Sequence, residues 1–371
     1  MRVLLAGGGT AGHCNPALAI ANYMKKKDPG SQIAFSGGKG GIEEQLVARA
    51  GYPIYTFPLS GLSRSLSPAG LKKNVGAIKN TFSAISAAKK IIREQKPDIV
   101  VGTGGYASFP MVYAAQACGV KTAVLEVNAT PGVALKQLSK KADCVMISFE
   151  ATRSFFPGHK HVVYTGSPVR QELIDAMGKD TTPLFDNGKP TVLCFWGSVG
   201  AMYMNRKMED FIALLAQDGS FNLMQAAGKS NFQWMPGEIK AKGVDLENCE
   251  NVRLVEYIYD MAGAMNGCDL VICRAGASTM AEVCACGKPA IIVPSPYVAD
   301  NHQEKNARTL ERAGAALVEL EPETDGKALF EQAKKLLADR EMLDKMSQNA
   351  RKLAIYDALD RIYAAIAETI G

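Results

Sequence analysis

The chain has 371 residues, 47% of them hydrophobic and 21% charged, a composition typical of a globular protein with a sizeable core. Because this length exceeds that of an ordinary single domain, it predicts two domains. The net charge of +5 is too small to indicate a nucleic-acid-binding protein, and no strip of interleaved aromatic and basic residues supports that function.

The N-terminus is not typical of a secretory signal, because only four apolar residues separate Arg2 from the first glycines. The longest uncharged run, 99–120, contains glycines and Pro110, so we predict a strand, a loop and a helix there and no membrane span. The nine cysteines lie in apolar stretches without zinc-ligand spacing, which predicts free thiols in a reducing compartment. The four histidines are too dispersed for a metal cluster.

Short β-rich runs alternate with helical stretches, the pattern of a doubly wound parallel sheet in each half of an α/β protein. The predicted strands are 2–6, 32–36, 54–58, 99–101, 122–126, 144–148 and 162–164, then 192–196, 222–226, 252–256, 270–273, 290–293 and 316–318. A Gly/Pro turn at 165–170 predicts the seam between domains 1–166 and 167–349. The closing stretch, 342–371, has a continuous helical pattern, and we expect its end, 350–371, to pack back on the first domain.

Three glycine-rich turns follow predicted strands, at 7–12, 102–106 and 197–200. A strand that ends at glycines and continues as a helix presents backbone N–H groups at a helix N-terminus, which suits a phosphate. Because such turns occur in both halves, the sequence predicts two phosphate-bearing ligands, as in a transferase.

The first turn also satisfies the G-x-G-x-x-G pattern of dinucleotide-binding domains. Such a domain needs an acidic residue at the end of its second strand to hold the ribose. Here the second strand ends in serine and glycine, and the nearest acids, Glu43 and Glu44, fall in the next predicted helix. We therefore disfavour NAD.

Several polar residues lie where a ligand would bind. His13 directly follows the first turn, and either accepts a hydroxyl proton or caps the helix. Glu282 lies about two turns into an otherwise apolar helix and could accept ribose hydroxyls. The polar run 300–306 suits sugar hydroxyls, although a helix N-terminus also explains it. Arg170, at the seam, could hold a pyrophosphate.

Apolar residues at helical spacing follow the third predicted strand: Leu71, Val75, Ile78, Phe82 and Ile85. We expect this stripe to pack in the core. The lysines and arginines around it, at 72, 73, 79, 89, 90 and 93, also allow docking to an anionic bilayer.

Five segments together, at 8–20, 104–108, 166–170, 273–282 and 301–307, closely resemble the MurG family, the glycosyltransferase family 28 enzymes that form lipid II in bacterial peptidoglycan synthesis. The resemblance implies a GT-B fold, with two Rossmann-like domains and an interdomain cleft. It also implies inverting transfer of N-acetylglucosamine from UDP-GlcNAc to the muramyl C4 hydroxyl of undecaprenyl-pyrophosphoryl-MurNAc-pentapeptide (lipid I). The expected location is the cytoplasmic face of the bacterial membrane.

The resemblance also assigns roles to residues. It implies His13 as the base. The donor would contact Thr10, Gly12, Asn128, Arg170, Ser198, Tyr257, Ile258, Ala277, Ser278, Glu282, His302, Gln303 and Asn306. The acceptor would contact Gly9, Ala11, Gly104, Gly105 and Tyr106. No cofactor or metal ligand is implied, and Mg²⁺ assistance with UDP is left open.

The sequence departs from the family pattern at Leu125, where histidine is common, and at Val199, where glutamine is common. Two other functions stay open at this point. A UDP-GlcNAc 2-epimerase would use a similar fold but would form ManNAc without a lipid acceptor. A non-catalytic nucleotide-sugar-binding subunit would bind UDP without transferring the sugar.

Overall fold

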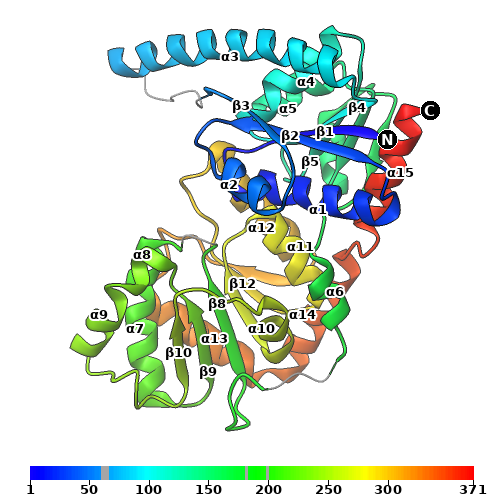
Figure 1. Ribbon diagram of the computed structural model, residues 1–371. Coiled ribbons are helices and arrows are strands. Elements are labelled where there is room, and N and C mark those ends of the chain that lie inside the picture. Colours follow the sequence, from blue (N-terminus) through cyan, green and yellow to red (C-terminus); the bar gives the residue numbers. More distant parts are fainter. Residues whose placement is uncertain (60–66, 180–182, 198–199) are drawn as a thin grey trace. The chain divides into compact units, whose positions relative to one another are not determined.

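A computed structural model describes residues 1–59, 67–179, 183–197 and 200–371, with side chains described for all of these except 68–73 and 299 (Figure 1). The chain forms two compact units. Unit 1 comprises Met1–Pro168 and Asp357–Gly371, and unit 2 comprises Val169–Tyr356.

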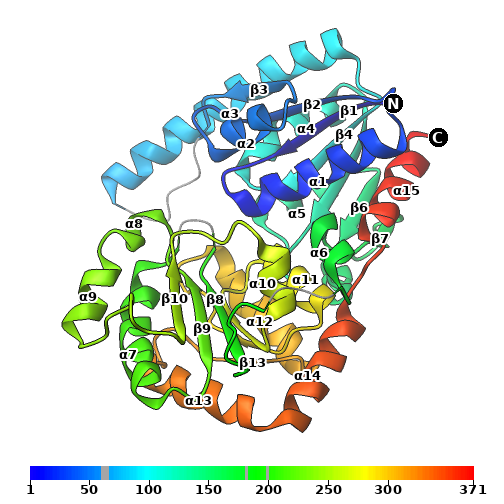
Figure 2. The same cartoon turned by 60° about the horizontal axis from the view of Figure 1, so that its bottom comes forward.

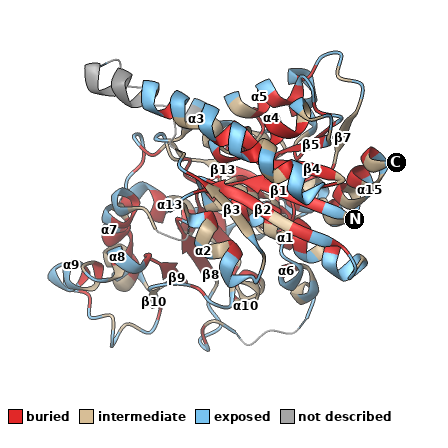
Figure 3. Ribbon diagram, turned by 45° about the horizontal axis from the view of Figure 1, so that its top comes forward, coloured by how far each residue is buried: buried red, intermediate tan, exposed pale blue. Residues whose placement is uncertain are grey.

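Unit 1 is built on a seven-stranded sheet in which all neighbouring strands are parallel, in the order β3-β2-β1-β4-β5-β6-β7. The strands are β1 (Arg2–Gly7), β2 (Gln32–Gly38), β3 (Ile54–Phe57), β4 (Ile99–Gly104), β5 (Lys121–Glu126), β6 (Cys144–Ile147) and β7 (Val162–Tyr164). Apolar residues make up most of β1 and half of β4, and both strands are buried almost throughout (Figure 3). Burial on both faces explains why these strands are continuously apolar.

The helices of unit 1 are α1 (Ala11–Lys27), α2 (Ile42–Arg49), α3 (Pro68–Gln95), α4 (Phe109–Ala117), α5 (Val133–Ser139) and α15 (Ala358–Ile370), with 3₁₀ turns η1 (Tyr106–Ser108) and η2 (Glu150–Phe155). α1 contacts both α2 and α15, while α4 contacts α3 and α5. The last helix therefore returns to the start of the chain, and both termini lie in unit 1 (Figures 1 and 2).

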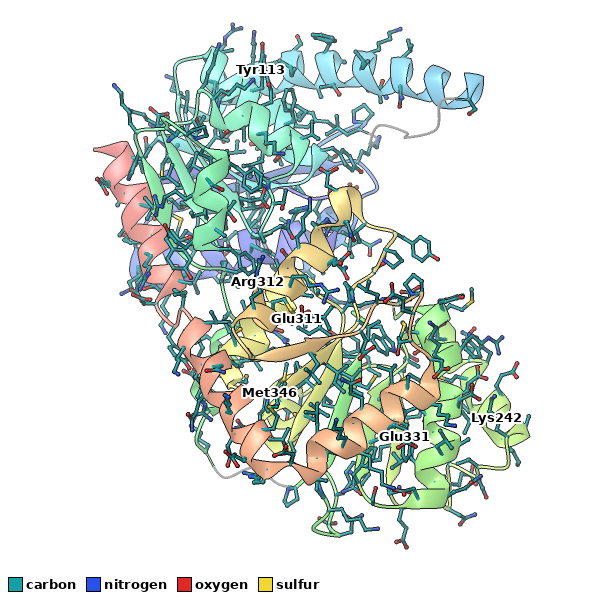
Figure 4. All side chains as sticks on the ribbon, turned by 180° about the vertical axis from the view of Figure 1, so that it is seen from behind. Tyr113, Lys242, Glu311, Arg312, Glu331 and Met346 are labelled. Atoms are coloured by element: carbon teal, nitrogen blue, oxygen red, sulfur yellow. The ribbon has the colours of Figure 1, made fainter. Side chains whose placement is uncertain are left out.

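Unit 2 has a six-stranded parallel sheet in the order β10-β9-β8-β11-β12-β13. Its strands are β8 (Thr191–Phe195), β9 (Asn222–Ala226), β10 (Val252–Val255), β11 (Leu270–Cys273), β12 (Ala290–Ile292) and β13 (Ala316–Val318). Its helices are α6 (Gln171–Ala176), α7 (Met202–Asp218), α8 (Lys229–Phe232), α9 (Met235–Ala241), α10 (Met261–Gly267), α11 (Ala277–Cys286), α12 (His302–Arg312), α13 (Gly326–Ala338) and α14 (Arg340–Leu353), with a 3₁₀ turn η3 (Ala299–Asn301). α7, α9, α13 and α14 share one apolar core with the sheet. In the view from behind, α13 and α14 are the orange and salmon helices nearest the viewer (Figure 4).

The helix predicted over 342–371 is interrupted, which corrects the sequence reading. α14 ends at Leu353, Ala354 is extended, and α15 begins only at Ala358. The interruption coincides with the passage of the chain from unit 2 to unit 1. α14 and α15 are each amphipathic, so their two helical patterns look like one continuous pattern in the sequence.

The stripe expected to pack in the core is mostly exposed, which is a second correction. Val75, Ile78 and Phe82 of α3 are 68%, 50% and 69% exposed, and of the stripe's described side chains only Ile85 is buried. The buried face consists instead of Ala77, Ala84, Ile85, Ala88 and Ile92. Leu71, Lys72 and Lys73 lie outside the described side chains. No helix among the described residues has the length and hydropathy needed to cross a membrane.

Candidate functional site

Each sheet reverses its strand order at one point, between β1 and β4 in unit 1 and between β8 and β11 in unit 2. In open parallel sheets, ligands bind outside the carboxyl ends of the strands at such a point. The glycine-rich turns follow β1, β4 and β8, and the turn that starts α11 follows β11. The fold thus places the predicted glycine turns at the switch point of each sheet.

In unit 1, the first glycine turn is held by a residue that the sequence reading had set aside. Glu43 is only 1% exposed although it lies on the first turn of α2. Its Oε2 accepts a hydrogen bond from the Gly9 N–H at 3.0 Å, and its Oε1 accepts one from the Gly38 N–H at 2.7 Å. The Gly9 amide is therefore engaged within the protein.

His13 is held from β4. Its Nδ1 lies 3.2 Å from the carbonyl oxygen of Thr103, and the Thr103 hydroxyl donates to the His13 carbonyl at 2.8 Å. A carbonyl oxygen only accepts, so this contact makes Nδ1 the donor nitrogen of the neutral imidazole. Nε2 is then the nitrogen that accepts a proton.

The second glycine turn packs directly on the first. A Cβ at Gly104 would lie 2.6 Å from His13 Nδ1, and one at Gly105 would lie 2.1 Å from the carbonyl oxygen of Gly8. Both residues have positive φ, 102° and 74°, a region that favours glycine. The next residue, Tyr106, places its ring against Gly9, where a Cβ would lie 2.8 Å from Cε1. Thus Gly9, Gly104, Gly105, Tyr106 and His13 gather in one place.

Asn128 follows β5 and is oriented by Glu126. The backbone N–H and the Nδ2 of Asn128 both donate to Glu126 Oε1, at 2.9 and 3.1 Å, and the Gly132 N–H donates to Oε2 at 3.1 Å. Burial raises the pKa of Glu126 to about 7, although these three donors favour the ionised form. The carboxyl group thus fixes the loop 127–132 from inside.

In unit 2, the N-terminus of α11 presents Ala277 and Ser278, and its N-cap residue is Gly276, which has no side chain to cap the helix. The N–H groups of such a first turn have no partner within the helix and favour an anion. Asn306 of α12 is fully buried and its Nδ2 donates to the Ala275 carbonyl at 3.1 Å, so it supports this turn. Gln303 accepts from the Ser295 N–H at 2.8 Å, and His302 begins α12.

Arg170 and Glu282 meet each other. Arg170 Nε donates to Glu282 Oε1 at 2.8 Å, and the two side chains are 48% and 13% exposed. This contact joins the residue before α6 to the second turn of α11. The structure thus brings together a predicted diphosphate contact and a predicted ribose contact.

The remaining predicted donor residues are distributed over both units. Tyr257 and Ile258 follow β10 at the same carboxyl edge of the unit 2 sheet, with Tyr257 exposed and Ile258 buried. Thr10, Gly12 and Asn128 belong to unit 1. Ser198 and Val199 lie outside the described residues. Within the described part of the chain, no three His, Cys, Asp or Glu side chains are grouped as metal ligands.

Sequence reasoning missed Glu43 and Thr103. The sequence places Glu43 within a helix and not at the end of β2, so it predicts no ligand role for this residue. A signal was nevertheless present, because glycines at 37, 38, 40 and 41 precede this acid closely. No sequence pattern points to Thr103, because its hydrogen bonds with His13 depend on β1 and β4 being neighbours in the sheet.

Two family models match the chain. Residues 3–147 match the glycosyltransferase family 28 N-terminal domain, and residues 191–362 match the C-terminal domain of the same family. Together they cover most of both units.

Relatives of similar length agree with this match. A protein of Acetivibrio thermocellus named UDP-N-acetylglucosamine--N-acetylmuramyl-(pentapeptide) pyrophosphoryl-undecaprenol N-acetylglucosamine transferase is 41% identical, over 99% of this chain and 97% of its own. The crystal structure of Acinetobacter baumannii MurG has a TM-score of 0.76 and 28% identity, over 99% of each chain. A putative UDP-N-acetylglucosamine 2-epimerase of Listeria monocytogenes shares the fold alone, with a TM-score of 0.67 and 16% identity over 99% of this chain and 96% of its own. The chain therefore belongs to the MurG group of glycosyltransferase family 28 and has the GT-B fold.

Proposed function

We propose that this protein transfers N-acetylglucosamine from UDP-N-acetylglucosamine to the C4 hydroxyl of MurNAc in undecaprenyl-pyrophosphoryl-MurNAc-pentapeptide, with inversion, to give lipid II. The observation that carries this proposal is the 41% identity, over nearly the full length, to a relative named for this transfer. The site geometry supports it, because each sheet carries a polar, glycine-lined switch point.

His13 is the proposed base on the acceptor side. Because its Nδ1 donates to the Thr103 carbonyl, Nε2 accepts the proton of the attacking hydroxyl. The hydroxyl oxygen then displaces UDP from the anomeric carbon in one step, which inverts the configuration. Gly104, Gly105 and Tyr106 line the same place, as expected for residues that bind the acceptor.

The donor is proposed to bind to unit 2. The first turn of α11, with Ala277 and Ser278, would meet the diphosphate through backbone N–H groups. Arg170 would meet the same charge through its guanidinium, and Glu282 would accept the ribose hydroxyls. A helix N-terminus contributes only about 0.3–1 kcal/mol, or up to ~2 when partly buried. Orientation of the two substrates must therefore supply most of the rate enhancement.

This reaction requires no cofactor in our proposal, and any assistance of Mg²⁺ would act on the departing UDP. The contacts that we assign to Thr10, Gly12, Asn128, Ser198, His302 and Gln303 rest on the family resemblance.

We also propose that α3 docks on the anionic cytoplasmic face of the membrane, where the lipid acceptor resides. Val75, Ile78 and Phe82 are exposed apolar residues at spacings of three and four, so they share one face of the helix. Lys89 and Arg93 continue this face after a further seven and four residues. Apolar residues next to basic ones suit insertion into an anionic bilayer surface.

The proposed function is tested by incubating the protein with labelled UDP-N-acetylglucosamine and a short-chain lipid I analogue. We expect the label to appear in a disaccharide product that forms only when the acceptor is present. Formation of ManNAc without an acceptor would favour the epimerase instead. Binding of UDP without transfer would favour a non-catalytic subunit.

A further inference from the structure

Glu43 joins two segments of unit 1 through one buried carboxylate. Its two oxygens accept the N–H groups of Gly9, after β1, and of Gly38, at the end of β2. The side chain starts from the first turn of α2, where the helix dipole favours a negative charge. Glu43 thus tethers the first glycine turn to the end of β2.

The space for this carboxylate exists because neighbouring residues lack side chains. A Cβ at Gly8, Gly37 or Gly41 would lie 2.3, 2.4 or 2.7 Å from an atom of Glu43. Cβ atoms essentially never lie within 3.0 Å of a non-bonded atom, so a side chain at any of these positions would displace the Glu43 side chain. The glycines therefore leave the space that this side chain occupies.

The tether changes what the first glycine turn can bind. The N–H of Gly9 is directed at Glu43, and a second anion at the same amide would be repelled by the carboxylate. On its other side, Gly9 packs against the ring of Tyr106. Burial raises the pKa of the Tyr106 hydroxyl, and the charge of Glu43 raises it further. Glu43 therefore acts on both the backbone and the aromatic residue of the predicted acceptor site.

The same turn leads directly into His13. α1 begins at Ala11, and its N-cap residue, Thr10, makes no side-chain capping bond. The first turn of α1 is instead restrained from two sides, by Glu43 at Gly9 and by Thr103 at His13. Loss of either restraint would allow the imidazole to shift.

We propose that Glu43 is a positioning residue of the acceptor side. Its carboxylate accepts the Gly9 N–H, which would otherwise be available to a bound anion. It thereby fixes the first turn of α1, which carries His13, and the ring of Tyr106. This inference rests on the proposed function, because it assigns Glu43 to the acceptor side of that reaction. It also implies that an acceptor phosphate does not bind to the Gly9 N–H, because Glu43 already accepts that hydrogen bond.

The test compares Glu43→Gln with Glu44→Gln. Glutamine keeps the volume of Glu43 but directs an NH₂ group at one of the two N–H donors, so one hydrogen bond is lost. Glu44 is the matched control, because it lies next to Glu43 in the same helix turn but accepts the Gly40 N–H, at 2.6 Å. Amide hydrogen exchange of the segment 7–14 reports on the tether, and steady-state kinetics report on positioning.

For Glu43→Gln we expect faster exchange over 7–14 and a kcat/KM for the acceptor that is about 10- to 100-fold lower, in part because the KM for the acceptor rises, with an unchanged KM for UDP-N-acetylglucosamine. Glu44→Gln should match the wild type in all three. A purely structural role would reduce the active fraction without changing the KM for the acceptor, and that result would overturn the proposal, as would unchanged exchange.

If Glu43→Gln does not fold, Glu43→Asp takes its place, since aspartate keeps the charge but has a shorter side chain. We expect the same changes, smaller in size. Unchanged hydrogen exchange, or an unchanged KM for the acceptor, would again overturn the proposal. A wild-type protein that transfers no sugar would refute the proposed function, whereas the exchange result would still test the tether.

Discussion

Arg170 Nε donates a hydrogen bond to Glu282 Oε1 at 2.8 Å, so two residues with different predicted roles toward the donor neutralise each other's charge. Because the Arg170 side chain is 48% exposed, this ion pair contributes little to stability, about 0–1 kcal/mol. Its importance is for binding. A ligand that takes either side chain must compete with the other one.

Replacement of Glu282 by glutamine should weaken donor binding. The ribose would lose a charged acceptor, which is worth about 1.5–3 kcal/mol, so we expect the KM for UDP-N-acetylglucosamine to rise about 10- to 100-fold. The control is Glu311→Gln, which breaks the Arg308–Glu311 ion pair in the same unit, at 2.8 Å; Glu311 is labelled in Figure 4. Equal KM values for the two variants would contradict the role of Glu282.

Replacement of His13 by glutamine should remove the base. General base catalysis contributes about 10²- to 10⁴-fold, so we expect kcat to fall within this range while UDP binding in unit 2 is unchanged. Single-turnover kinetics and UDP titration measure the two effects. His161→Gln is the control, since its imidazole lies 3.8 Å from Glu368, far along the chain from the glycine turns. Near-normal turnover of His13→Gln would exclude His13 as the base.

Glu126 should make stability depend on pH. Its pKa of about 7 in the folded chain is above the ordinary value of 4.5, so the unfolded chain releases this proton first as pH rises. The contribution of Glu126 to the free energy of unfolding therefore decreases between about pH 4.5 and 7, by on the order of 3 kcal/mol. Urea unfolding of the wild type and of Glu126→Gln at both pH values measures it. A constant difference between the two proteins would show that burial does not raise this pKa.

The exposed face of α3 should carry membrane binding. Burial of a Val, Ile or Phe side chain contributes about 1.5–3 kcal/mol, so the triple variant V75S/I78S/F82S should bind vesicles of phosphatidylglycerol and phosphatidylcholine at least ~100-fold more weakly. Transfer to a short-chain, water-soluble acceptor should be unaffected. Tyr113 of the neighbouring helix α4 is also partly exposed (Figure 4), and Tyr113→Ser should weaken binding less.

The control for vesicle binding is Met342→Ser, which removes an exposed apolar side chain from α14 in unit 2. Sedimentation with the vesicles separates bound from free protein. Wild-type binding that is equally strong to pure phosphatidylcholine would argue against a role of the basic residues. Undiminished binding of the triple variant would argue against α3.

The strands were predictable because each is a short apolar run bounded by glycine or polar residues, as in β1, β8 and β11. Their ends agree with the sequence reading to within about three residues, the largest difference being at the end of β4, where Gly102, Thr103 and Gly104 extend the pairing. Glycine has no strand preference of its own, so this extension depends on the neighbouring strand.

The features that the sequence did not predict depend on contacts between distant segments of the chain. The periodicity of α3 revealed an apolar face but not which face packs against the rest of unit 1, and the small Ala77, Ala84 and Ala88 are buried instead of Phe82. Glu43 could not be assigned because its partners come from β1 and β2 together. The break between α14 and α15 follows from where each helix packs, which no local pattern encodes.

The most direct test of the account maps each substrate separately by amide hydrogen exchange. We predict that UDP-N-acetylglucosamine protects segments 254–261 and 274–286 of unit 2, and that a short-chain lipid I analogue protects segments 7–14 and 102–106 of unit 1. Protection of segments 254–261 and 274–286 by the acceptor instead of the donor, or of neither glycine turn by the acceptor, would contradict the assignment of donor and acceptor to the two sheets.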